Sequence, residues 1–218
     1  TRDTFNLEQV EVVKGPAGAD IGRGASAGYI NLVSKLPSRT DAISAEASLN
    51  TAGASRLTGD LNKAFGASSA VRLNVMAQGG DVPNRDRVEN TSLGFAPSLA
   101  FGLGTPTRLY LYSQHIRQDN VPDGGIPTIG MEGFYNADAR LQGGSKVNEK
   151  NYYGSANDQE KVHADMVTVK IEHDMAEGMK LSNIARYGKT RMDRIMTGVY
   201  TLAAPSANPA SWTVSRRS

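Results

Sequence analysis

The chain has no cysteine among its 218 residues. This absence excludes a disulfide scaffold and any metal site built on thiolates. A dominant charge is missing too, because 24 Lys and Arg residues oppose 22 Asp and Glu residues and leave a net charge of +2. Nucleic-acid binding leaves a strongly basic footprint, so we expect no nucleic-acid partner.

Long apolar runs are also absent, since none approaches the 18 residues that a transmembrane helix needs. Histidines are few: His115, His163 and His173. On one strand, His163 and His173 would lie about 33 Å apart, too far for one metal ion. No nucleophile-elbow or zinc-protease motif occurs. We therefore expect no enzyme, no metal site and no resident cofactor.

What the sequence does contain is alternation of apolar and polar residues from Asp41 onward. Such a period of two is typical of strands with one apolar face. The predicted strands are 41–51, 55–65, 69–79, 91–102, 107–117, 162–173, 179–191 and 194–202. Short turns separate some of them, and longer gaps fall at 80–90 and 118–161.

Segments of about ten residues suit a tilted strand that crosses a membrane. The pattern therefore predicts antiparallel strands of a transmembrane β-barrel, with a soluble β-sandwich as the alternative. In a barrel, the apolar set would face lipid and its polar neighbours would face the lumen. That set is Ile43, Leu49, Val71, Leu73, Val75, Leu93, Phe95 and Leu99. Four tyrosines within strands are expected to join aromatic girdles: Tyr110, Tyr112, Tyr187 and Tyr200.

The segment Glu8–Pro37 has a different composition, EQVEVVKGPAGADIGRGASAGYINLVSKLP. Two β-prone runs flank a glycine-dense bend. Pro16 has no N–H to donate and must end the first run, and the glycines permit positive φ and close backbone approach. These features predict a compact domain of short strands.

This segment resembles the C-terminal part of the plug domain of TonB-dependent outer-membrane receptors. The residues in register with that signature are Glu11, Val12, Lys14, Gly15, Pro16, Gly22, Gly24, Gly28, Ile30, Asn31, Val33, Lys35 and Pro37. The resemblance implies the end of a plug over 1–38 and the N-terminal strands and loops of an incomplete barrel over 39–218. Its plug-motif residues are Lys14, Gly15, Pro16, Gly22, Arg23, Gly24, Gly28 and Asn31. Arg23 is expected to pair with Glu46 or Asp60 on the barrel wall.

The family implies a function: import of a ferric siderophore across the bacterial outer membrane, with iron carried as cargo. It also implies contact with outer-membrane lipid and energy from TonB, which acts on a plug segment that this sequence does not contain. The chain opens on Thr1 without an apolar leader and ends at Ser218 without a terminal aromatic strand. We therefore expect an internal fragment of a longer receptor.

The gap 118–161 carries a second resemblance. Its stretch NVPDGGIP, from Asn120 to Pro127, is similar to a loop of the catecholate-siderophore branch of the family. The family's topology would make this gap an extracellular loop. A ferric catecholate is a bulky aromatic anion, which arginine and tyrosine side chains suit. The candidate ligand residues are Arg117, Tyr135, Arg140, Tyr152 and Tyr153, with Arg117 and Tyr135 ranked first.

Two other readings remain. A non-transporting surface β-barrel or adhesin-like binding protein would show the same strands. A dinucleotide-binding enzyme fits the spacing Gly22, Gly24 and Ala27, with Asp41 as ribose ligand, but it requires a helix after Gly28.

Overall fold

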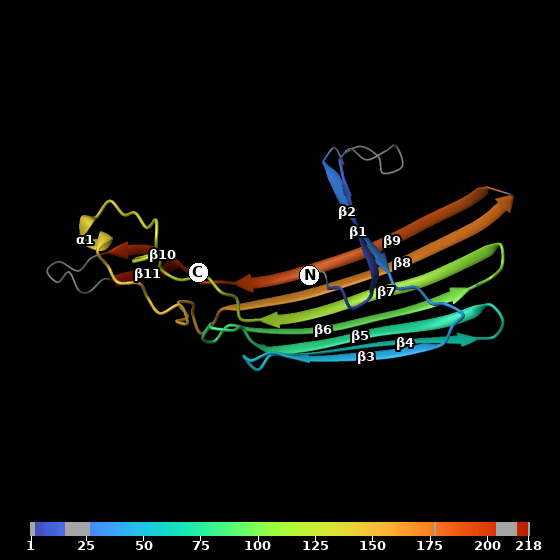
Figure 1. Cartoon of the computed structure of the whole chain (residues 1–218), viewed down its shortest axis with the longest axis horizontal. Coiled ribbons are helices and arrows are strands. Elements are labelled where there is room, and N and C mark those ends of the chain that lie inside the picture. Colours follow the sequence, from blue (N-terminus) through green and yellow to red (C-terminus); the bar gives the residue numbers. More distant parts are fainter. Residues whose placement is uncertain (1–2, 16–26, 177, 204–212, 218) are drawn as a thin grey trace.

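The computed structural model describes residues 3–15, 27–176, 178–203 and 213–217. Within these ranges the chain is almost wholly β, with one short helix, and most of it forms a single curved sheet (Figure 1). No helix in the described ranges is long and apolar enough to cross a membrane.

The glycine-rich segment forms an antiparallel hairpin of β1 (Leu7–Lys14) and β2 (Gly28–Ser34). The last pair of its register joins Lys14 to Gly28. Gly28 has φ 115°, and a Cβ built on it would overlap the carbonyl oxygen of Val13. Only glycine fits this approach of the two strands. Because a strand and not a helix follows Gly28, the dinucleotide-binding reading is wrong.

The other plug-motif positions are split by the described ranges. Gly15 has φ 91°, and Asn31 donates from Nδ2 to Oε2 of Glu11 at 2.7 Å across the hairpin. Pro16, Gly22, Arg23 and Gly24 lie outside the described residues. The ion pair predicted for Arg23 lies outside them as well.

From residue 42 the chain forms a seven-stranded antiparallel sheet in which each strand pairs with the next in sequence. Short turns favour this up-and-down order because they place consecutive strands side by side, and the order continues across the long connection between Asn120 and Gln159. The strands are β3 (Ala42–Leu49), β4 (Ser55–Phe65), β5 (Ser69–Asp81), β6 (Glu89–Phe101), β7 (Thr107–Asn120), β8 (Gln159–Ala176) and β9 (Met179–Ile195).

The two faces of this sheet differ as the alternation predicts. On the outer face, large apolar side chains are exposed, from 36% of Leu111 to 83% of Leu49. The eight residues predicted to form this set all lie on it by register, and no second sheet covers them in the described part. A β-sandwich would bury this face, so the sandwich alternative is wrong.

The inner face bears small and polar residues, many of them buried: Asn62, Ala70, Asn74, Ser92, Ser98 and Thr168. Tyr110 and Tyr112 also point to this face, opposite Ala100 and Ser98. The prediction that these two tyrosines join an outer aromatic girdle is therefore wrong. The outer face instead has Tyr187 and an edge-to-face pair, Phe65 and Phe101, with ring centroids 6.4 Å apart.

The N-terminal segment packs on the inner face, and the hairpin stands on that side of the sheet (Figure 1). Phe5 packs with Met76, Ala96 and Ile116 in a small apolar cluster. Next to it Asp3 accepts two hydrogen bonds from Arg56 of β4, at 2.6 and 3.0 Å.

The chain that leaves the hairpin is fixed to the same wall of the sheet. Lys35 pairs with Asp60 at 3.0 Å, and Asp60 also accepts two hydrogen bonds from Arg72. Arg72 reaches back to the carbonyl oxygen of Leu36 at 3.0 Å. Both ends of the hairpin are thus joined to β4 and β5 by charged groups.

Past β9 the structure departs from the predicted strands. The prediction of one strand over 194–202 is wrong, because β9 runs on to Ile195 and a separate hairpin follows. This hairpin pairs β10 (Gly198–Ala203) with β11 (Thr213–Arg217). It lies beyond the end of the large sheet, near the helix α1 (Ala139–Gln142), so Tyr200 of β10 lies outside the sheet as well (Figure 1).

Candidate functional site

The two longest connections of the sheet, 82–88 and 121–158, lie at one end, which we call the loop end, together with the turn 50–54. The opposite end has the short connections 66–68 and 102–106, and the chain passes there from Ala176 of β8 to Met179 of β9. The hairpin β10–β11 also extends from the loop end (Figure 1). Every residue predicted to bind a ligand belongs to this end.

Arg85 joins two of these loops. Its Nε and Nη2 donate to the two carboxylate oxygens of Asp123 at 2.6 Å each, and its Nη1 donates to the carbonyl oxygens of Glu149 and Asn151. The Arg85 guanidinium, together with an N–H from Gly125, holds the pKa of Asp123 below its usual range although partial burial opposes this. The bidentate pair fixes the Asp-Gly-Gly turn of the long loop.

Asp158 is a second anchor, 5% exposed. It accepts from the N–H and hydroxyl of Thr197 at 2.9 and 2.7 Å, from the Ser155 N–H at 3.0 Å and from the Tyr152 hydroxyl at 3.0 Å. Burial alone raises the pKa of Asp158, but these hydrogen bonds outweigh it and lower the pKa. Thr197 precedes β10, so this carboxylate joins the long loop to the second hairpin.

Tyr152 and Tyr153 both contribute hydrogen bonds to these loop contacts. Burial, and then the hydrogen bond to Asp158, raise the pKa of Tyr152 to about 12. The Arg87 guanidinium lies 5.9 Å from the centre of the Tyr152 ring. The carbonyl oxygen of Tyr153 accepts from Arg216 at 3.4 Å. Of the two predicted ligand residues, Tyr152 has its hydroxyl already engaged.

Tyr135 is the most open of the predicted ligand residues, with 82% of its surface exposed. It lines a cavity of about 540 Å³ between the long loop and β10. The cavity wall also includes Pro127, Phe134 and Tyr200. Three aromatic rings around an open cavity offer stacking surfaces for an aromatic ligand.

Arg140 lies in α1 and is exposed. Its Nε and Nη2 donate to the two carboxylate oxygens of Asp138, the N-cap residue of the helix, at 3.0 and 2.7 Å. The hydrogen bonds to Asp138 raise the pKa of Arg140, and the Asp138 carboxylate balances the charge of this guanidinium. It could meet an anion only by exchanging that partner.

Arg117 lies on the outer face of the sheet. Its register places it between Leu93 and His163, and its Nη2 bonds Asp165 at 3.0 Å. The neighbouring Ile116 and Gln118 face inward instead. This orientation does not favour the ligand contact that we predicted for Arg117, because strand parity directs the side chain away from the inner face.

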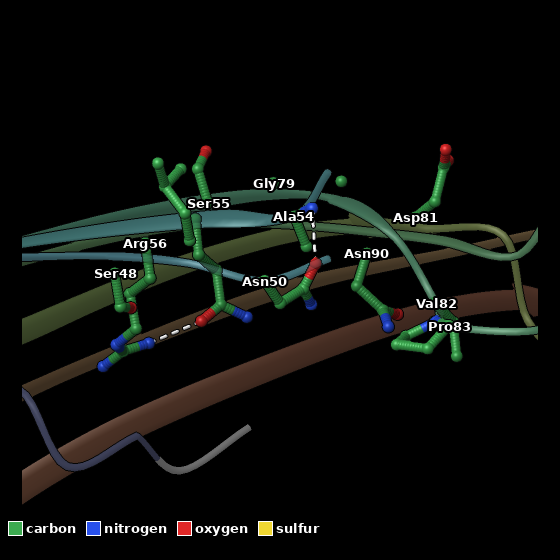
Figure 2. A pocket seen from close by; sticks show the side chains of 13 residues that line it. Ser48, Asn50, Ala54, Ser55, Arg56, Gly79, Asp81, Val82, Pro83 and Asn90 are labelled. Carbon is green, nitrogen blue, oxygen red and sulfur yellow. Dashed lines mark hydrogen bonds between the residues drawn. The ribbon is translucent and has the colours of Figure 1, made fainter. Parts of the chain in front are cut away.

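A further cavity of about 390 Å³ lies at the loop end between β3 and β6. Asn50, Arg56 and Asn90 project into it from one side of the sheet, whereas Asp81 projects to the other (Figure 2). Arg56 bonds both Gln78 and Asp3, so the N-terminal segment reaches this polar cavity.

Sequence reasoning missed three residues that define this end: Arg85, Asp158 and Tyr200. Neither Arg85 nor Asp158 belongs to a motif, and their distant partners lie 38 to 66 positions away in the sequence. No cluster of three His, Asp or Glu side chains that could hold a metal ion occurs in the described ranges.

Comparison with known proteins identifies similar chains. No family model matches. The catecholate siderophore receptor Fiu of Escherichia coli K12 is 44% identical over 223 residues, covering 99% of this chain and 29% of that protein. The probable TonB-dependent receptor BfrD of Bordetella pertussis is 42% identical over 90% of this chain and 26% of its own length.

Comparison with solved structures identifies the same receptor as comparison of sequences. The crystal structure of the ferric-catecholate import receptor Fiu in its open form superposes with a TM-score of 0.92 at 43% identity, over 99% of this chain and 34% of that one. The similarity therefore extends over the hairpin, the sheet and the loops alike. The chain spans less than a third of the length of the curated relatives that it matches.

Proposed function

The chain belongs to the TonB-dependent siderophore receptors of the bacterial outer membrane, and from this premise we propose that the complete protein imports a ferric siderophore. The observation that carries the proposal is the 44% identity to a catecholate siderophore receptor over 99% of the chain. Its relatives are transport receptors and not enzymes. A non-transporting surface barrel would share the sheet but has no need of a hairpin fixed inside it.

In this proposal, residues 1–38 form the end of the plug and 39–218 the first strands and loops of the barrel. The charged contacts of Asp3, Lys35 and Arg72 join the plug segment to the wall. TonB supplies the energy that moves the plug. Iron enters as cargo, and the protein needs no cofactor of its own.

A ferric catecholate is our proposed ligand, bound at the loop end on the outside of the cell. Tyr135 is the leading contact, because it is exposed beside two more aromatic rings. Arg140 and Tyr153 are secondary, and Tyr152 positions the loop. Arg117 is the weakest of the predicted five on geometric grounds.

Binding titration of the complete receptor, purified in detergent, tests the proposal. A ferric catecholate and a ferric hydroxamate of similar size serve as ligand and control. We expect saturable binding of the catecholate and much weaker binding of the hydroxamate. Equal affinity for the two ligands would contradict the catecholate assignment, and binding of neither would contradict the siderophore assignment.

A further inference from the structure

A row of basic side chains crosses the outer face near the loop end. Arg117, His163 and Arg191 are direct cross-strand neighbours on β7, β8 and β9. Two arginines, Arg117 and Arg191, thus flank one imidazole, and like charges close together on one face of a sheet destabilise it unless something offsets them. All three side chains are exposed.

The row next to it, toward the turns, is polar. His115, Asp165 and Lys189 are cross-strand neighbours there. Asp165 accepts from Arg117 at 3.0 Å and lies 2.7 Å from Nδ1 of His115, so this acid is already shared. On the loop-end side of the basic row, Asp119 and Asp193 flank Lys161 in a third row.

Four basic side chains in these rows have no bonded partner in the described ranges: His163, Lys189 and Arg191, and Lys161 between its two acids. They point away from the inner face, so no part of the bound plug segment meets them. An external anion could accept hydrogen bonds from His163, Lys189 and Arg191.

A groove begins directly below these rows. Pro97 is in β6, a central strand, where proline is rare because it has no N–H for the ladder. It pairs with Leu73 of β5, but the pairing of β6 with β7 is interrupted between Phe95–His115 and Ser98–Tyr112.

This interruption leaves a groove of about 240 Å³. Its outer-face lining is Pro97, Leu99, Leu111, Ser113 and Val167. Only Ser113 among these is polar, and its hydroxyl lies 3.1 Å from Nε2 of His115. Ser113 and His115 thus lie between an apolar groove and the basic row, on one face and two residues apart along each strand.

We propose that this surface binds one phosphorylated lipid of the outer leaflet, with the headgroup phosphate at His163, Lys189 and Arg191 and an acyl chain in the Pro97 groove. The order along the strands fits a lipid: charge at the loop end, ester-compatible polar groups in the middle and an apolar groove toward the centre of the membrane. A free anion would need only the basic row. The inference uses the outer-membrane location and the orientation of the proposed receptor, but not its siderophore.

Charged side chains on the lipid face cost little near the interface and more toward the midplane. Basic residues near a membrane surface attract anionic headgroups, each by roughly a fivefold change in affinity. The basic row therefore marks the interface, and the groove lies within the apolar band that begins at Val167.

The test is lipid titration of the complete receptor in delipidated micelles, followed by native mass spectrometry. The probes are dilauroyl phosphatidic acid, dilauroyl phosphatidylcholine and inorganic phosphate. The variant is the double change Lys189→Gln and Arg191→Gln. The matched control is Arg194→Gln, which removes a cation from the same strand but from the inner face, where Arg194 pairs with Glu160.

We expect the affinity for phosphatidic acid to fall about 25-fold in the double variant, because two cations are removed, and to stay within twofold in Arg194→Gln. Phosphatidylcholine should bind more weakly and equally in all three proteins. Unchanged phosphatidic acid binding in the double variant would overturn the proposal, and so would displacement of the lipid by an equal concentration of inorganic phosphate. Ferric-siderophore affinity measured on the same variants should not change, which separates this test from that of the proposed function.

Discussion

Replacing Asp158 by alanine removes a buried carboxylate that joins two segments of the loop end, the long loop and the start of the second hairpin. Thr197, Ser155 and Tyr152 all donate to it. The change should detach β10 from the long loop without touching the strands of the sheet. A loop that holds a ligand loses affinity when it must be reordered on binding.

The expected cost follows from the donors left behind. Each buried N–H without an acceptor costs about 1–3 kcal/mol. The backbone N–H groups of Thr197 and Ser155 would both lose theirs, for roughly 2–6 kcal/mol, and water entering the vacated space recovers part of it. We therefore expect local destabilisation of about 2–4 kcal/mol, which is at least thirtyfold in the opening equilibrium of the loop.

The pH dependence has a definite sign. The folded-state pKa of Asp158 is lowered, so its stabilisation is present above the unfolded-state value near 4 and is lost as pH falls through the folded value. The anchor should hold unchanged from about pH 5 to pH 8 and weaken only below about pH 4.

Hydrogen exchange of the complete receptor measures this directly. Amides of 150–158 and 197–203 should exchange at least thirtyfold faster in Asp158→Ala, while those of β5 and β6 stay unchanged. Asp138→Ala is the control, because Asp138 is an acid of the same loop whose side chain bonds only Arg140 among the described residues. Exchange within twofold of the parent protein would refute the anchoring role.

Three further outcomes are expected. Leu73→Arg, at mid-strand on the outer face, should destabilise the folded barrel in lipid by about 2–4 kcal/mol; a change below 0.5 kcal/mol in reversible unfolding, on the order of an ordinary surface substitution, would contradict a lipid-facing position. Tyr135→Ala should weaken ferric-catecholate binding about tenfold, on the scale of one stacked ring, whereas Arg117→Ala should leave titrated affinity within twofold; the reverse ranking would mean that Arg117 and not Tyr135 lines the site. Gly28→Ala should disrupt the β1–β2 hairpin, because its Cβ has no room beside Val13; protease resistance of the plug equal to that of the parent would show that the hairpin accommodates the methyl group.

The strands and their faces follow from the sequence because local alternation is enough to set them. Leu73, Phe95 and Leu99 lie on the predicted face, since a period of two leaves no other choice once the register is fixed by short turns. The hairpin also follows, because two β-prone runs flank glycines and Gly28 can adopt the positive φ and the close approach to Val13 that the pairing requires.

The site could be predicted only in part, because its contacts are not local. The strand register places the Arg117 side chain on the outer face. Without a register, its position at the end of a predicted strand suggested that it lines the ligand entrance. Tyr110 and Tyr112 are of the residue type found in aromatic girdles, but their even positions on the strand place their side chains on the inner face. Nothing near Asp158 in the sequence indicates that Thr197, 39 positions later, donates to it twice.

The proposed transport function is tested most directly by iron uptake in cells. The complete receptor is expressed in a bacterium lacking its own catecholate receptors, and radiolabelled iron is supplied as a ferric catecholate, with TonB present or deleted. The account predicts uptake that requires both the receptor and TonB. Receptor that reaches the outer membrane and binds the chelate, but gives no TonB-dependent uptake, would contradict it.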